Sequence, residues 1–102
     1  MSTNIPLLEK QYFRNEQFVS RRIADEFLLI PVANQLKGDN WLFVLNEVGG
    51  RIWELIDRDR SVQQIGQLLL EEFDTSPEQL EEDLLRLLDQ LQELGAIEAV
   101  AE

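Results

Sequence analysis

The spacing of apolar residues changes once along this 102-residue chain, near Asn46, and this change constrains the fold more than any other feature. Before Asn46, apolar residues come in short runs separated by turn-forming residues, which is typical of strands. After Asn46, they recur every three or four residues, as on the buried face of a helix. A chain of this length holds one hydrophobic core, so the strands and the helices must share it. The order predicts an α+β domain in which the sheet comes first.

Three short strands are predicted before the change of spacing. Phe18–Ile23 form the first strand and Phe27–Ile30 form the second, with the turn residues Ala24–Glu26 between them. Pro31 lacks a donor N–H, so it is expected at the end of the second strand or on an edge. After a glycine-containing turn, Trp41–Leu45 form the third strand. Strands connected this closely are expected to form an antiparallel meander.

Three helices are predicted after the change, and each has a start signal. Asn46 is suited to be the N-cap of the first helix. Ser61 and Ser76 begin the second and third helices, each with a glutamine three residues later that completes a capping box. Pro77 occupies the first position of the third helix, and Gly95 is its natural C-terminal cap. The sequence therefore predicts a winged-helix-like domain, with a three-stranded antiparallel sheet followed by three helices.

The ends of the chain show no regular period. Residues 1–15 are predicted to be an N-terminal arm, flexible or ordered only against the body or a partner. Residues 16–98 are predicted to be a single domain, and residues 99–102 a short tail. No apolar stretch is long enough to cross a membrane, and no signal peptide is visible. A cytoplasmic location without membrane contact is expected.

The net charge of −11 is concentrated in the second part of the chain. Residues 1–60 hold eight basic and nine acidic side chains, whereas residues 61–102 hold one basic and eleven acidic side chains. Winged-helix domains that read DNA need several arginines and lysines on the recognition helix. Here the predicted third helix offers Arg86 alone. Nucleic-acid binding is therefore not expected.

Catalytic and metal-binding chemistry is also not expected. The chain has no cysteine and no histidine, which removes a thiol nucleophile, the commonest general base and the commonest metal ligands. Asp57 and Asp59 alternate as in a calcium loop, but the glycine and the final glutamate of such a loop are missing. We expect no enzyme activity, no metal and no cofactor.

Apolar residues occupy both faces of the predicted third strand. Trp41, Phe43 and Leu45 alternate onto one face, and Leu42 and Val44 occupy the other. A sheet that is apolar on both faces needs cover on both, and three helices of this size cover one. The N-terminal arm, a second subunit or a partner is left to cover the rest. If this strand ends the sheet, its unpaired edge can accept an extended peptide.

The predicted third helix carries leucines outside its core stripe. The stripe is predicted to consist of Leu80, Leu84, Leu87, Leu91 and Leu94, which fall within about 80° of one another on a helix. Leu88 lies on the shoulder of this stripe, and Leu85 lies outside it on the same flank as Glu81. This flank and the strand edge together would form a groove for a peptide. The alternative is a structural or regulatory protein that forms a homodimer through the same edge and binds no peptide.

A series of residues resembles the signature of the pyrroloquinoline-quinone biosynthesis protein D (PqqD-like) family. The matching positions are Leu45-Asn46, Gly49, Ile52-Trp53, Leu55, Asp57, Ser61-Val62, Ile65, Asp83, Leu91 and Gly95. The resemblance covers the chain from about Phe18 to Ile97. One departure is the turn Asp57-Arg58, where the family usually has Asp-Gly. Losing this glycine is expected to cost stability if φ is positive there.

The resemblance implies a function as well as a fold. Such proteins are non-catalytic recognition elements for ribosomally made, modified peptides, and the leader of the precursor adds to the third strand and packs on the third helix. The resemblance implies that the domain presents this precursor to a radical S-adenosylmethionine enzyme, and it leaves open whether the product is pyrroloquinoline quinone. Both arguments together predict a peptide site made of Trp41, Leu42, Phe43, Val44, Leu45, Glu81, Leu84, Leu85 and Leu88.

Overall fold

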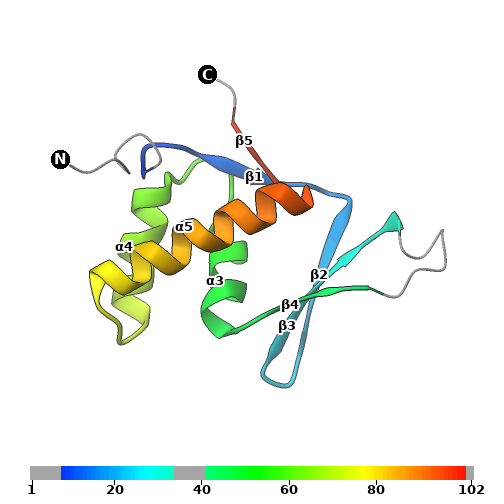
Figure 1. The fold of residues 1–102 in the computed structure, drawn as a ribbon, viewed down its shortest axis with the longest axis horizontal. Coiled ribbons are helices and arrows are strands. Elements are labelled where there is room, and N and C mark those ends of the chain that lie inside the picture. Colours follow the sequence, from blue (N-terminus) through cyan, green and yellow to red (C-terminus); the bar gives the residue numbers. More distant parts are fainter. Residues whose placement is uncertain (1–7, 34–40, 101–102) are drawn as a thin grey trace.

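The fold was obtained as a computed structural model that describes residues 8–33 and 41–100. A three-stranded antiparallel sheet, in the order β2-β3-β4, is followed by three helices (Figure 1). The elements in chain order are β1 (Tyr12–Arg14), β2 (Phe18–Ile23), β3 (Glu26–Pro31), β4 (Phe43–Leu45), α3 (Glu47–Leu55), α4 (Val62–Glu72), α5 (Pro77–Leu94) and β5 (Ile97–Ala99). The predicted α+β architecture is confirmed.

The strands of the main sheet agree closely with the prediction, except at the start of β4. Trp41 and Leu42 precede this strand, which begins at Phe43. Antiparallel pairing places Phe27 opposite Leu45. The turn residue Ala24 between β2 and β3 has a φ of 55°, in the left-handed region that favours glycine.

The helix caps form largely as predicted. The Asn46 side chain accepts a hydrogen bond from the Gly49 N–H at 2.7 Å. Ser61 opens α4 with a complete capping box, and Gly95 ends α5 with a φ of 84°. The second capping box is wrong. Ser76 accepts from the Gln79 N–H, but the Gln79 side chain donates to Asp83 Oδ1 at 3.0 Å instead of reaching back.

The sequence pattern did not indicate the small sheet formed by β1 and β5. In this sheet, Tyr12 pairs with Ala99 and Arg14 pairs with Ile97. Tyr12 is buried, and both this burial and the nearby Asp89 carboxylate raise the pKa of its hydroxyl. Each strand is only three residues long, and the partners lie more than 80 residues apart. The local spacing of apolar residues therefore cannot predict this pairing.

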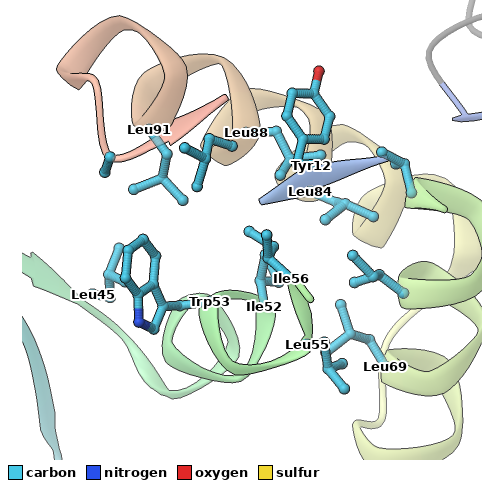
Figure 2. Packing of buried hydrophobic residues seen from close by; sticks show 14 of the residues in the cluster. Tyr12, Leu45, Ile52, Trp53, Leu55, Ile56, Leu69, Leu84, Leu88 and Leu91 are labelled. Atoms are coloured by element: carbon cyan, nitrogen blue, oxygen red, sulfur yellow. The ribbon is translucent and has the colours of Figure 1, made fainter. Parts of the chain in front are cut away.

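The core lies between the main sheet, the three helices and β1. Helix α3 packs closely on β3 at Gly50, where a Cβ atom would lie 2.7 Å from the Phe27 ring. Figure 2 shows α5 leucines pointing toward α3, with Tyr12 on the Leu88 side. The buried residues of α5 are Leu80, Leu84, Leu88 and Leu91.

The predicted core stripe of α5 is wrong in its rotation about the helix axis. Leu88 is 3% exposed, so it belongs to the core rather than to a shoulder. Leu87 and Leu94 are only partly buried and pack at the margin of the core. Tyr12 from β1 belongs to the same buried cluster and lies near Leu88 and Leu84 in Figure 2. The opposite shoulder, with Leu87, remains accessible.

Candidate functional site

Strand β4 presents an unpaired outer edge next to a groove. In the described part of the chain, β4 pairs with β3 on one side and forms the end of the sheet on the other. The backbone N–H and C=O groups on such an edge are ready to pair with an added strand. A groove of about 320 Å³ lies beside it. A backbone edge and a hollow are therefore found at the same place.

Three elements form this groove, which we call the β4–α5 groove. Its walls and floor consist of Phe43, Val44, Leu45 and Asn46 from β4 and its end, Val48, Gly49 and Ile52 from α3, and Asp83, Arg86, Leu87 and Gln90 from α5. Helix α3 packs against both β4 and α5. The floor helix therefore fixes the distance between the strand edge and the opposite helical wall.

The α5 wall of the groove is charged as well as apolar. Arg86 bridges to Glu82 at 2.9 Å and to Asp83 at 3.6 Å. These side chains are 44–67% exposed, and exposed ion pairs contribute about 0–1 kcal/mol. A bound peptide can therefore replace either partner at little cost. Leu87 lies on the same wall and supplies an apolar contact next to these charges.

The strand half of the predicted site lies largely where we expected it. Phe43, Val44 and Leu45 line the β4–α5 groove. Trp41 and Leu42 are 47% and 42% exposed, precede the strand, and are not among the lining residues. The edge that could receive a peptide is thus shorter than the predicted strand.

The helix half of the predicted site lies on the other side of α5. Glu81 and Leu84 line a separate hollow of about 170 Å³ between α4 and α5, next to Leu8. Leu84 and Leu88 are 2% and 3% exposed, so their side chains belong to the core and do not offer a binding surface. Leu85 is partly buried and does not line the β4–α5 groove.

Sequence reasoning missed the α5 residues that do face β4, namely Asp83, Arg86, Leu87 and Gln90. At about 100° per residue, Leu87 lies on one shoulder of the buried stripe, and Glu81 and Leu85 lie on the other. The helical period identifies both shoulders, but it does not tell which one faces the sheet. That choice depends on how α5 is rotated when it packs, which is a property of the whole fold.

A larger hollow of about 860 Å³ lies elsewhere, and we call it the β1–β2 hollow. It is lined by Phe13–Ser20, Trp53, Ile56–Arg58 and Glu98, and it shares no residue with the β4–α5 groove. Two of its arginines stack on aromatic rings. Arg14 lies 5.8 Å from the Trp53 ring centre, and Arg58 lies 4.5 Å from that of Phe13.

The loop at this hollow confirms the expected strain at Arg58. Its φ is 76°, in the left-handed region that glycine adopts without cost. The Arg58 N–H donates to the Tyr12 carbonyl at 2.9 Å, which ties the loop to β1. Asp57 accepts hydrogen bonds from the N–H groups of Arg60 and Asp59, and the first of these is the main cause of its lowered pKa.

Residues 8–33 and 41–100 contain no group of three or more acidic side chains arranged to hold a metal ion. None of the helices described there is both long enough and apolar enough to span a membrane.

Comparisons with known proteins agree with the resemblance found in the sequence. The profile of the family described as "Coenzyme PQQ synthesis protein D (PqqD)" matches residues 26–97, which is more than half of the chain. The solved structure "TbiB1 in Complex with the TbiA(beta) Leader Peptide" is similar, with a TM-score of 0.68 and 27% sequence identity. That match covers 88% of this chain and 99% of the TbiB1 chain. A comparison with curated proteins found no significant match.

Proposed function

This chain belongs to the coenzyme PQQ synthesis protein D (PqqD) family, and from this premise we propose that it is a non-catalytic adaptor for a precursor peptide. It binds the leader segment of a ribosomally made precursor by strand addition to β4. The observation that carries the proposal is the unpaired β4 edge beside a groove with an apolar floor. The similarity to a structure solved with a leader peptide supports the same mode of binding.

The geometry of the groove suits an extended peptide. Backbone groups of an extended peptide pair with β4, and alternate side chains of such a peptide point to opposite sides. Those on one side reach Val48 on the floor, above the buried Ile52, and Leu87 on the helical wall. Main-chain hydrogen bonds supply affinity in this arrangement, and the side-chain contacts supply specificity.

The charge of the protein adds a preference for basic groups in the ligand or in the partner enzyme. Residues 61–102, which include the α5 wall, hold one basic and eleven acidic side chains. Opposite charges across an interface raise the rate of association, and salt screens this attraction. The affinity of the protein for a basic leader should therefore fall as ionic strength rises.

The adaptor presents the bound precursor to a maturation enzyme, and a radical S-adenosylmethionine enzyme is our proposed partner. The chemistry belongs to that enzyme, because this chain has neither cysteine nor histidine. No cofactor of its own is needed for holding a peptide. A cytoplasmic location, where ribosomally made precursors are available, fits this role. The product is pyrroloquinoline quinone or another modified peptide.

Titration of the isotopically labelled protein with a synthetic leader peptide from a candidate precursor tests this proposal. We expect chemical shift changes in Phe43–Leu45, in Val48 and Ile52, and in residues 83–90. A peptide of the same composition in scrambled order is the control and should cause no such changes. Changes confined to the β1–β2 hollow, or no binding at all, would contradict the proposal.

A further inference from the structure

The three-stranded sheet has an apolar outer face, on the side opposite α3. The pairing register places Val19 beside Ile30, Arg21 beside Leu28, and Leu28 beside Val44 on this face. Val19, Ile23 and Val44 are 39%, 58% and 53% exposed. Contiguous exposed apolar residues of this kind are typical of an interaction surface.

The inner face of the same sheet shows what a covered face looks like here. Phe27, Leu29 and Leu45 are at most 5% exposed, and α3 packs over them. Side chains that alternate with these residues along β3 and β4 form the outer face and remain accessible. The contrast leaves a sheet with one face packed and one apolar face available to a partner.

Two charged residues of opposite sign lie on the outer face. Arg21 occupies the row of Leu28, and Glu26 occupies the next row, opposite Ile23. Among the described residues, neither Arg21 nor Glu26 forms an ion pair. This surface therefore carries a cation and an anion together with the apolar residues, so it is complementary to itself.

We propose that the outer sheet face is the interface of a homodimer, in which Arg21 of each copy pairs with Glu26 of the other. A two-fold axis in the plane of the interface that exchanges these two positions forms the ion pair twice. The same operation packs the apolar residues of one sheet on those of its partner. Face-to-face packing of two sheets is a common architecture.

The distribution of charge favours a second copy on this face over one on the helices. Helices α4 and α5 lie on the side of the molecule away from the β2–β3 hairpin (Figure 1), and residues 61–102 contribute a net charge of −10. Contact through those helices would bring two strongly acidic surfaces together. Contact through the outer sheet face keeps the acidic surfaces apart and screened by solvent.

This dimer goes beyond the proposed function and does not depend on it. The interface uses the outer face of the sheet, whereas the peptide pairs with the backbone edge of β4 and contacts the α5 wall, and of the residues named for the interface only Val44 also lines the groove. Arg21, Ile23 and Glu26, whose variants test the dimer, do not line the β4–α5 groove. Failure of one proposal would therefore not imply failure of the other.

Sedimentation equilibrium of the full chain over a wide concentration range tests the dimer. The average mass should rise with concentration from 11.9 kDa toward twice that value. Ile23→Asp, Arg21→Glu and Glu26→Arg should each weaken dimerisation at least about tenfold, because each places an unpaired or like charge in the interface. Arg21→Glu combined with Glu26→Arg should restore it, because the exchanged charges pair again.

Leu70→Asp is the matched control, since Leu70 is an exposed leucine on α4, 37% accessible and outside the proposed interface. This variant should dimerise like the original chain. Circular dichroism checks that each variant is folded. If Ile23→Asp does not fold, the two single charge variants and their double variant still test the dimer. A constant mass of 11.9 kDa at every concentration would overturn the proposal. The proposal would also be overturned if the double variant dimerised more weakly than both single variants.

Discussion

The β4–α5 groove and the β1–β2 hollow both border an edge strand of the main sheet, but they differ in the wall that faces the strand. In the smaller β4–α5 groove, the facing wall is a helix that offers Leu87 above an apolar floor. In the larger hollow, the facing residues include Asp57 and Arg58. Asp57 already accepts a hydrogen bond from its own loop, and Arg58 already stacks on the Phe13 ring. Under the proposed function, an edge strand and a large volume do not suffice for a peptide site, and an accessible apolar wall opposite the edge is also required.

The largest effects are expected from the helix that forms part of both hollows. Ile52 lies beneath the β4–α5 groove and Ile56 beside the β1–β2 hollow, and each is 1% exposed. Ile52→Ala and Ile56→Ala should each lower the free energy of unfolding by about 2–5 kcal/mol, because each leaves a cavity in the same core. Urea denaturation measures both values.

The conservative variants of the same pair separate stability from binding. Ile52→Val and Ile56→Val should each cost only about 0.5–1.5 kcal/mol of stability and leave the chain folded. Peptide affinity, measured by calorimetry, should stay unchanged for both variants, because both side chains are buried and a peptide does not contact them. A loss of affinity for Ile56→Val alone would place the peptide in the larger hollow.

A second pair of variants compares the two shoulders of α5. Leu87 lines the β4–α5 groove, and Leu85 lies on the other shoulder, and both are partly buried. Leu87→Ala should weaken peptide binding by about 1–2 kcal/mol, since it removes apolar contact area from the wall. Leu85→Ala should leave the affinity unchanged. Equal losses of affinity would mean that the peptide reaches around the helix.

These two leucines also mark the limit of what the sequence predicts. The caps at Asn46, Ser61 and Gly95 are determined by neighbours in the sequence, and the helix boundaries were predicted well for that reason. Each strand of the main sheet pairs with the strand that is next to it in the sequence, and the apolar runs were enough to predict these strands. Local signals therefore predict the elements and their order.

The rotation of α5 is not a local property, and the prediction failed there. The buried side of α5 shares its cluster with Tyr12, which comes from a strand whose partner begins at Ile97. No pattern within α5 distinguishes the shoulder covered by Tyr12 from the shoulder that faces β4. The predicted strand residues therefore line the β4–α5 groove in part, and the predicted helix residues lie on the shoulder of α5 that does not line it.

A smaller effect is expected at Arg58, in the wall of the larger hollow. Arg58→Ala keeps the unfavourable φ and loses the contact with the Phe13 ring, so it should cost about 0.5–1 kcal/mol. Arg58→Gly loses the same contact but relieves the backbone strain, which is worth about 1 kcal/mol. The glycine variant should therefore unfold at a higher urea concentration than the alanine variant. Peptide affinity should be the same for both, and a loss in either would assign the larger hollow a part in binding.

The smallest effect is expected from the Asp57 carboxylate, whose pKa lies below the ordinary value of 3.8 chiefly because it accepts the Arg60 N–H. A lowered pKa in the folded state means that the unfolded chain takes up the proton first as pH falls. The stabilisation is therefore present above about pH 3.8 and is lost as pH falls through the lower, folded-state value. Asp57→Asn keeps an oxygen acceptor but removes the charge that pairs with Arg60 at 2.7 Å. The variant should lose a few tenths of a kcal/mol at neutral pH, as expected for an exposed ion pair. Urea denaturation as a function of pH should show the two stability curves converging in acid. Curves that stay parallel down to the acid limit would show that the charge of Asp57 does not stabilise this loop.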